Sequence, residues 1–362
     1  MAIKGQATVV KHTGSHYLLS QLPDWNLFPA VLRGKIRLKG STATNPVAVG
    51  DIVNFEADVP EGVLEQDLAS YVTPENAAVI TSVEPRRNYI IRKSTNLSRQ
   101  SHIIAANLDR AFIIATIDYP EIKLPFLDRI LVTCEVYNIP VTIVLNKVDL
   151  YRESHAETLE AFHEIYEGAG YPILEVSALT GEGMDELREA CNGHVSLFSG
   201  VSGVGKSSLI KALDPSLNPR VGEISDVHLQ GKHTTTFYEM YALHSCPLEP
   251  SSCHSDPSSC PPVPSSCPPV PSSCHPERSE GSLGFIVDTP GLRGFGLVDL
   301  KKEEIALYFP EMLKASEGCR FTPCTHTHEP GCAVKEAVEA GEISYDRYSS
   351  YLGMLDEEGK YR

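Results

Sequence analysis

The chain has 362 residues, enough for two or three domains, and its charged fraction of 22% and hydrophobic fraction of 42% are those of an ordinary water-soluble protein. Its net charge of −16 argues against uniform, sequence-independent nucleic-acid binding, although a local basic face remains compatible with it. The longest apolar runs, such as 111–117, are too short to cross a bilayer, and the N-terminal residues lack the apolar core of a signal peptide. We therefore expect a cytoplasmic protein that does not span a membrane.

Residues 1–85 consist of short strand-like runs separated by turn residues, without a helical period. Short strands at such spacing are typical of small barrels such as the OB fold, which often bind oligonucleotides on a strand face. We predict an OB-like β-barrel over 1–85. Its strand-like runs are 5–10, 16–20, 30–40, 46–57 and 77–85.

Basic residues gather in two places, within this barrel and just after it. In the run LRGKIRLKG they occupy alternate positions, so on a strand they would share one face. The second group lies in 86–102, which we predict to be a basic linker. Basic side chains most often form a solvated face, but against the acidic background of this chain we favour contact with RNA. The residues concerned are Arg33, Lys35, Arg37, Lys39, Arg86, Arg87, Arg92 and Lys93.

From residue 103 the pattern changes to alternating strands and helices. Such alternation predicts a parallel sheet with crossover helices, and we place an α/β domain over 103–298. The predicted strands are 111–118, 140–147, 171–178, 194–200 and 283–291, and the predicted helices are 124–138, 153–170 and 206–213.

The tetrapeptide NKVD follows the second of these strands and resembles the guanine-reading motif of a GTPase. The Asp149 carboxylate would accept from N1–H and the exocyclic amino group of guanine, whereas adenine would leave it unpaired at a cost on the order of a few kcal/mol. Asn146 would brace the loop and contact the base, and the Lys147 stem would cover the ring. At the end of the next strand, Ser177 and Ala178 would bring a backbone N–H toward the guanine O6.

A phosphate-binding loop follows the fourth strand. The segment GVSGVGKS fits G-x-x-x-x-G-K-[ST] and lies between a predicted strand and a predicted helix, which is the context that this motif requires. Glycines let backbone N–H groups turn toward the phosphates, and the helix N-terminus adds positive potential. Lys206 would reach the β- and γ-phosphates, and Ser207 would ligate Mg²⁺. The loop comprises Gly200, Val201, Ser202, Gly203, Val204, Gly205, Lys206, Ser207 and Ser208.

Two further segments would complete a hydrolytic site. The last strand contains Asp288, which would hold Mg²⁺ through water, and the N–H of Gly291 would face the γ-phosphate. In the segment GKHTTT we expect Thr235 to close on Mg²⁺ and the γ-phosphate, with Thr234 as the alternative.

The residue that orients the attacking water is not evident. Leu292 stands after Gly291, where many GTPases place a glutamine. We therefore expect slow intrinsic turnover, and we propose that His233, beside the switch threonines, helps to position the water.

The order of these loops is unusual. Along the chain they run base, base, phosphate, switch, switch, whereas the phosphate loop comes first in an ordinary GTPase. A circular permutation explains this order, because termini that lie near each other can be joined and the chain opened elsewhere without disturbing the sheet. Each loop still follows the carboxyl end of a strand, where α/β sheets bind ligands.

Residues 246–280 interrupt this domain with a seven-residue repeat of Pro, Ser and Cys. Such a composition does not build a packed core, so we expect a disordered insertion on the surface. Two interpretations stay open: a repeat expansion tolerated in a surface hairpin, which we favour, and a metal-binding cysteine tract.

A Cys/His cluster lies in the C-terminal region, which we otherwise predict to be mostly helical. Cys319, Cys324, His326 and Cys332 have the spacing C-x4-C-x-H-x5-C. Three thiolates and one imidazole make a closed, structural Zn²⁺ site. His328 is the competing histidine, and the spacing alone does not reject it.

Together, the barrel, the permuted GTPase and the Cys/His cluster resemble the bacterial family of ribosome small-subunit-dependent GTPase A. The segments that carry the resemblance are IAANLDR, LPFLDR, NKVD, GVSGVGKSSL, GKHTTT, DTPG and CRFTPCTHTHEPGCAV. The resemblance implies a GTP hydrolase that uses Mg²⁺ and one structural Zn²⁺, binds the small ribosomal subunit and its rRNA, acts in late maturation of the subunit and is stimulated by it. We expect a monomer with a zinc-binding domain over 299–362.

Two other functions stay open. An RNA-binding assembly chaperone would hold GTP without productive hydrolysis, and phosphate release with and without small subunits separates it from a GTPase. A P-loop ATPase or kinase requires NKVD to be accidental, and competition between ATP and GTP tests that reading.

Overall fold

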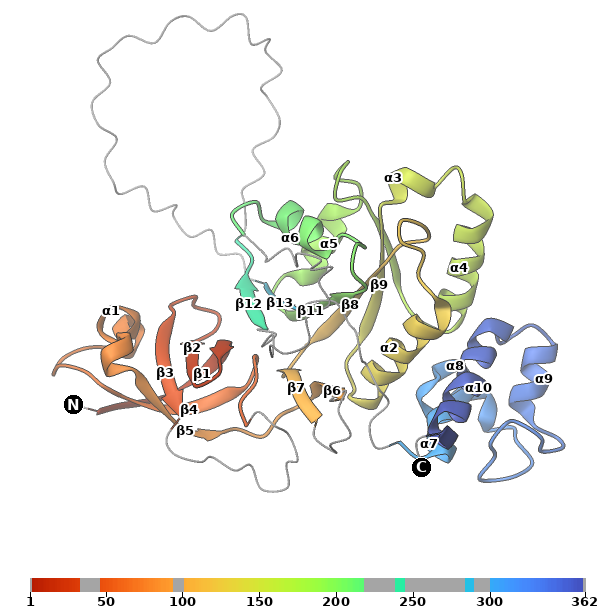
Figure 1. Cartoon of the computed structure of the whole chain (residues 1–362), viewed down its shortest axis with the longest axis horizontal. Helices are drawn as coiled ribbons and strands as arrows, with labels where there is room; N and C mark the ends of the chain where they lie inside the picture. Colours follow the sequence, from red (N-terminus) through yellow and green to blue (C-terminus); the bar gives the residue numbers. More distant parts are fainter. Residues whose placement is uncertain are drawn as a thin grey trace, which may run out of the picture.

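A computed structural model describes residues 2–32, 46–93, 101–217, 238–244, 284–289 and 300–360 of the chain. In Figure 1 they form an N-terminal barrel, a central α/β domain and a helical C-terminal module, arranged from left to right. Four predicted features lie outside the described residues: the basic run 33–39, the switch segment GKHTTT, the insertion 246–280 and Gly291.

The N-terminal part is a five-stranded barrel, as predicted. Its strands pair in the order β1-β2-β3-β5-β4, and a further pairing of β1 with β4 closes the sheet on itself. Alternate side chains point inward, so Val9, Phe28 and Phe55 are buried in one core. The elements are β1 Ala2–Thr13, β2 His16–Ser20, β3 Phe28–Leu32, β4 Ile52–Asp58, α1 Leu68–Tyr71 and β5 Ala78–Val83.

The central part is an α/β sheet in the strand order β10-β9-β8-β11-β13-β12. All neighbouring pairs are parallel except β12 with β13, which is antiparallel. The strands are β8 Arg110–Ala115, β9 Val141–Asn146, β10 Ile173–Val176, β11 Val195–Gly200, β12 Glu239–Ala242 and β13 Phe285–Asp288.

Helices cover both faces of this sheet. Leu131 of α2 and Phe162 of α4 belong to the core on one face, and Leu187 of α5 and Ile210 of α6 belong to the core on the other. Parallel strands covered on both sides need apolar residues at nearly every position, which is why these runs were recognisable in the sequence. The helices are α2 Leu124–Val136, α3 Val148–Tyr151, α4 Ala156–Gly168, α5 Met184–Cys191 and α6 Lys206–Leu213.

The segment predicted to be a linker, 86–102, contains a strand. β6 (Tyr89–Lys93) pairs antiparallel with β7 (Ser101–Ala106), and Ile90 belongs to the core of the α/β domain. Strand pairing also joins the barrel to the central sheet, because β1 pairs with β12 at Lys11 and Glu239, whose side chains form an ion pair of 2.5 Å. The described strands of the two parts therefore make one continuous sheet.

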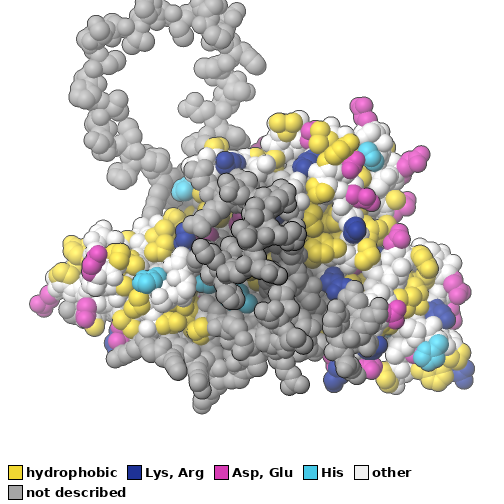
Figure 2. Space-filling model, in the orientation of Figure 1, with side chains coloured by type: hydrophobic (Ala, Val, Ile, Leu, Met, Phe, Trp, Pro, Cys, Tyr) yellow, Lys and Arg dark blue, Asp and Glu magenta, His cyan; other side chains and the backbone are white. Residues whose placement is uncertain are grey.

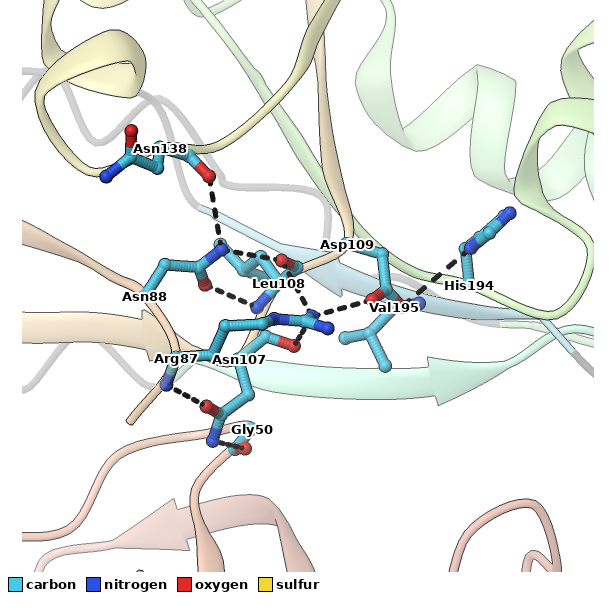
Figure 3. A network of polar contacts seen from close by, with 9 residues as sticks. All are labelled: Gly50, Arg87, Asn88, Asn107, Leu108, Asp109, Asn138, His194 and Val195. Carbon is cyan, nitrogen blue, oxygen red and sulfur yellow. Dashed lines mark hydrogen bonds and ion pairs between the residues drawn. The ribbon is translucent and has the colours of Figure 1, made fainter. Parts of the chain in front are cut away.

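A network of hydrogen bonds holds the turn between β7 and β8 (Figure 3). Asn107, with a left-handed φ of 55°, donates to the carbonyl of Gly50 in the barrel at 2.9 Å. Its own side-chain oxygen accepts from the backbone N–H of Arg87 at 2.8 Å. The Arg87 guanidinium pairs with Asp109 at 2.6 Å, and Asp109 accepts from the N–H of Val195 at 2.7 Å. The barrel is thus tied to the first residue of β11, the strand that leads to the phosphate loop.

The C-terminal module packs its helices against α2 (Figure 1). Val132 of α2 is part of its apolar core. Arg347 of α10 is fully buried and pairs with Asp128 of α2 at 2.7 Å and with Glu311 of α8 at 2.8 Å. The helices are α7 Lys302–Ile305, α8 Pro310–Ser316, α9 Ala333–Glu339 and α10 Tyr345–Lys360.

Candidate nucleotide and metal sites

The phosphate loop connects β11 to α6, and each of its glycines is required for a different steric reason. A Cβ on Gly200 would lie 2.4 Å from the carbonyl oxygen of Ile114 in β8. Gly203 and Gly205 have φ values of 89° and 94°, in the left-handed region that glycine adopts without strain. A Cβ on Gly205 would also lie 2.3 Å from Nδ2 of Asn146. The glycines therefore both turn the loop and admit the base-reading loop beside it.

A lysine and a carboxylate form the charged centre of this loop. Lys206 donates from Nζ to the carbonyl oxygens of Gly200 at 2.8 Å and Val201 at 3.1 Å. Asp288 ends β13, directly beside β11. Burial lowers the pKa of Lys206 and raises the pKa of Asp288 to about 6, and each charge partly offsets the shift of the other. Among the described residues, the buried Oδ1 of Asp288 has no hydrogen-bond partner, so a cation fits there.

Asn146, at the end of β9, connects three loops. Its Nδ2 donates to the carbonyl of Val204 in the phosphate loop at 2.8 Å, and its Oδ1 accepts from the N–H of Ala178 at 3.3 Å. The Asn146 side chain is buried, so these bonds are not in competition with water. The segments after β9, β10 and β11, far apart in the sequence, therefore meet at one side chain.

Lys147 and Asp149 are also held in place by hydrogen bonds within the protein. Lys147 has a left-handed φ of 68°, and its Nζ donates to the carbonyl oxygens of Gly203, at 2.7 Å, and of Tyr119. One oxygen of Asp149 accepts from the hydroxyl of Ser177 at 2.5 Å. The carboxylate that would read guanine thus has a fixed orientation, which reduces the entropy lost on binding.

Two residues of this region were not predicted. Tyr151 of α3 donates its buried hydroxyl to the carbonyl of Asn146 at 2.8 Å and so supports the NKVD loop. Tyr119, in the loop after β8, accepts from Lys147. Neither residue lies in a motif. In the sequence, Tyr151 is recognisable only as an aromatic residue shortly after NKVD.

The remaining residues predicted for the hydrolytic site divide into two groups. Ser207 lies half-buried in the first turn of α6, and Ser202 and Ser208 are exposed. The others lie outside the described residues and stay predictions: Thr234, Thr235, His233 and Gly291.

The Cys/His cluster comes together between α8 and α9. The ligand atoms of Cys319, Cys324, His326 and Cys332 all lie within 4.8 Å of one another. Nδ1 of His326 is 3.4 Å from the sulfur of Cys332 and 3.6 Å from that of Cys319, and these two sulfurs are 3.9 Å apart. A tetrahedral Zn²⁺ with ordinary bond lengths has ligand–ligand distances of roughly 3.5–3.8 Å, so the cage fits this ion.

Of the two competing histidines, His326 belongs to the cluster. It is buried, whereas His328 is exposed and its Nδ1 contacts the hydroxyl of Thr327 at 2.9 Å. The Glu329 carboxylate holds the turn, because it accepts from the N–H of Thr325 at 2.9 Å and of Thr327 at 3.0 Å. The structure thus places His326, and not His328, beside the three cysteines.

The basic residues predicted to bind RNA are only partly described. Arg86 donates to both oxygens of the fully buried Asp51, at 2.6 and 2.7 Å. This bidentate pair gives Arg86 a structural role. Because its guanidinium already binds Asp51, we do not expect its side chain to contact an RNA phosphate. Arg87 keeps 59% of its side chain exposed while it pairs with Asp109. The side chains of Arg33, Lys35, Arg37, Lys39, Arg92 and Lys93 are not among those described.

On the face that Figure 2 shows, Asp and Glu side chains lie along the outer edge of the α/β domain, over α3 and α4, and also on the barrel and the C-terminal module. Among the helices that are described, none has both the length and the hydropathy needed to cross a membrane.

Comparisons with known proteins agree with this site. The model of the RsgA GTPase family matches residues 83–247. A relative from Bacteroides fragilis, named small ribosomal subunit biogenesis GTPase RsgA, is 45% identical over 98% of each chain. A relative of the same name from Porphyromonas gingivalis is 41% identical over 98% of this chain and 97% of its own.

Solved structures extend the likeness to the whole fold. The crystal structure of YjeQ from Thermotoga maritima matches with a TM-score of 0.69 and 28% identity, over 99% of this chain and 100% of the other. YloQ, described as a circularly permuted GTPase, matches in fold with a TM-score of 0.64 and 22% identity, over 99% and 96% of the two chains. The predicted architecture of barrel, permuted GTPase domain and C-terminal Cys/His cluster is thereby confirmed. By its motifs, its fold and its likeness over nearly its whole length to these relatives, the chain belongs to the RsgA GTPase family and is a GTP hydrolase.

Proposed function

We propose that this GTPase binds the small ribosomal subunit, acts in a late step of its maturation, and hydrolyses GTP faster when bound to it. The names of its relatives support the part on subunit biogenesis. The observation that carries the part on GTP is the contact of Asn146 with both Val204 and Ala178, since it assembles a guanine-reading site against a phosphate loop.

In this proposal the chain supplies positioning and electrostatic stabilisation for an in-line attack of water on the γ-phosphate. Lys206 and the N–H groups of the loop stabilise the negative charge that develops on the phosphates. Ser207 and Asp288, with Thr235, would hold Mg²⁺. Mg²⁺ when bound neutralises charge on the β- and γ-phosphate oxygens.

Base selection rests on Asp149. Its carboxylate accepts from two donors of guanine, and adenine lacks both. The Asp149→Asn variant should therefore lose at least a hundredfold in affinity for GTP, because the amide offers one acceptor and opposes a donor with a donor. The same variant should gain affinity for XTP, whose C2 oxygen accepts from an amide. Equal displacement of labelled GTP by ATP in the unmodified protein would contradict the assignment.

Hydrolysis is tested by multiple-turnover phosphate release as small subunits are added. We expect a low rate alone, because Leu292 stands in place of a water-orienting glutamine, and a rate that rises and saturates with the subunit. With XTP, Asp149→Asn should recover the stimulation, which separates base recognition from subunit binding. A protein that binds GTP but is not stimulated would instead fit an assembly chaperone.

Within this mechanism we assign the positioning of water to His233. The variant His233→Ala should keep its affinity for GTP and for the subunit but lose most of the stimulated rate. Unchanged subunit-stimulated turnover in this variant would remove His233 from the mechanism.

We further propose that the protein is a cytoplasmic monomer with one structural Zn²⁺, and that it contacts rRNA through its basic residues. The contact set is Arg33, Lys35, Arg37, Lys39, Arg87, Arg92 and Lys93. Replacing the four residues of the first run with alanine should weaken binding to small subunits and flatten its dependence on salt. The matched control is Lys301→Ala with Lys302→Ala, on α7 and its preceding residue, which should leave subunit binding unchanged.

A further inference from the structure

The loop between β8 and α2, residues 116–123, belongs to none of the recognised motifs but contacts two of them. Lys147 of NKVD donates from Nζ to the carbonyl oxygens of both Tyr119 and Gly203. Cδ of Pro120 lies 3.6 Å from the position of a Cβ on Gly203. Since β8 lies between β9 and β11 in the sheet, this loop emerges between the base-reading loop and the phosphate loop.

Tyr119 has an unusual backbone conformation within this loop. Its φ of 58° lies in the left-handed region, which is rare for a bulky aromatic residue. Hydrogen bonds impose this conformation: the Tyr119 N–H donates to Oδ1 of Asp118 at 2.7 Å, and its carbonyl accepts from Lys147. The next residue is also fixed, because the hydroxyl of Thr116 donates to the carbonyl of Pro120 at 2.5 Å. Strained residues that their surroundings hold in place cluster at ligand sites.

Tyr119 lies beside the expected path of the nucleotide, because its carbonyl contacts the lysine of the base-reading loop. A single exposed tyrosine is common, so the 63% exposure of Tyr119 does not by itself indicate a ligand site. The positions of the neighbouring loops do indicate one. The base lies at the Asp149 end of the NKVD loop, and the phosphates lie at the loop that contains Gly203. Nζ of Lys147 reaches Gly203 and Tyr119 together, so Tyr119 lies where the ribose joins the two ends of the nucleotide.

We propose that Tyr119 is a further nucleotide-contacting residue of this GTPase, whose ring packs against the ribose of bound GTP or GDP and slows its release. The contact is between the apolar face of the ring and the carbon atoms of the sugar, so it does not need the phenol hydroxyl. The proposal concerns nucleotide binding by the isolated protein and stands apart from any action on the ribosome.

Nucleotide release from the full-length protein tests this contact. Protein loaded with radiolabelled GDP is mixed with excess unlabelled GDP, and equilibrium competition between the two gives the affinity. The variant Tyr119→Ala should release nucleotide on the order of tenfold faster, and Tyr119→Phe should match the unmodified protein. Tyr345→Ala removes another exposed tyrosine, 71% accessible at the start of α10, and should leave release unchanged.

A glycine variant separates the ring from the backbone. Tyr119→Gly keeps the carbonyl that Lys147 contacts and adopts a left-handed φ without strain. If the ring holds the nucleotide, Tyr119→Gly releases it as fast as Tyr119→Ala. A wild-type rate in Tyr119→Ala overturns the proposal, as does a wild-type rate in Tyr119→Gly beside fast release in Tyr119→Ala, which assigns the effect to the backbone. Equal loss in Tyr119→Phe and Tyr119→Ala also overturns it, because the hydroxyl would then carry the contact.

Discussion

The GTPase domain carries one module on each side, and the two are attached by different kinds of contact. The C-terminal module is attached through Arg347, which is fully buried, pairs with Asp128 and Glu311, and lies 4.6 Å from the ring centre of Phe309. The barrel is attached through strand pairing, through Val10 and Val49, which are buried in the core of the α/β domain, and through an ion pair with β12 that stays in contact with water. Lys11 keeps 23% of its side chain exposed in its pair with Glu239.

This difference determines how easily each attachment opens. Separating a buried pair leaves a charge without a partner in the protein interior and costs about 3–5 kcal/mol. An exposed ion pair contributes about 0.2–1 kcal/mol to stability, and salt screens the attraction between its charges. We therefore expect the buried ion pair of the C-terminal module to hold it against α2 at any ionic strength, and the ion pair between the barrel and β12 to weaken as the salt concentration rises.

The largest expected effect comes from removing the metal cage of the C-terminal module. Structural Zn²⁺ binding contributes on the order of 10 kcal/mol in small zinc modules. Cys332→Ala should therefore lose its zinc and show fast amide hydrogen exchange over 300–360, while the affinity for GDP is kept. His328→Ala is the matched control, because this histidine lies outside the cage, and it should keep one zinc per chain. Stoichiometric zinc in Cys332→Ala, measured by elemental analysis, would contradict the assignment of the ligands.

The second effect tests the buried attachment itself. Arg347→Met leaves two carboxylates buried without their cation, so the free energy of unfolding should fall by about 3–5 kcal/mol, as measured by urea denaturation. Arg320→Met changes an exposed arginine of the same module and should alter it by less than about 0.5 kcal/mol. If the two variants lost equal stability, the contrast between the two attachments would be wrong.

The smallest effect is expected at the barrel. Lys11→Met removes a partly exposed ion pair and should lower the free energy of unfolding by less than about 1 kcal/mol at low salt, and by less still at 0.5 M salt. A double-mutant cycle with Glu239→Gln isolates the coupling of this pair. A coupling as large as that of Arg347 with Asp128 would remove the distinction between the two sides of the molecule.

Local patterns in the sequence predict much of the fold. All residues of β8 after Arg110 are buried, so this strand appears as an unbroken apolar run. The phosphate loop was recognisable for a similar reason, since its glycines and its lysine act within a few residues of one another. The cysteine spacing likewise predicted a metal cage, but the choice between His326 and His328 required the positions of both rings.

Contacts between distant residues account for what the sequence did not reveal. Asp128 and Arg347 are 219 positions apart, so a buried arginine looked like any other charged residue on a helix. In the sequence Arg86 resembles any other exposed basic residue, because its partner Asp51 is 35 positions away. The basic residues around β6 predict a linker, and its antiparallel pairing with the neighbouring β7 is evident only in the structure. Tyr119 matters only through the two loops that flank it.

The pairing of β1 with β12 has a consequence for solubility. β12 would otherwise end the α/β sheet with unpaired N–H and C=O groups, and an uncovered edge of this kind can pair with a strand of another chain. β1 lies against that edge at Lys11 and Glu239 and shields it. A shortened chain that lacks the first 85 residues would therefore be expected to self-associate through its sheet even if its nucleotide site were intact. We therefore expect the barrel to protect the enzyme from aggregation, whether or not it also binds RNA.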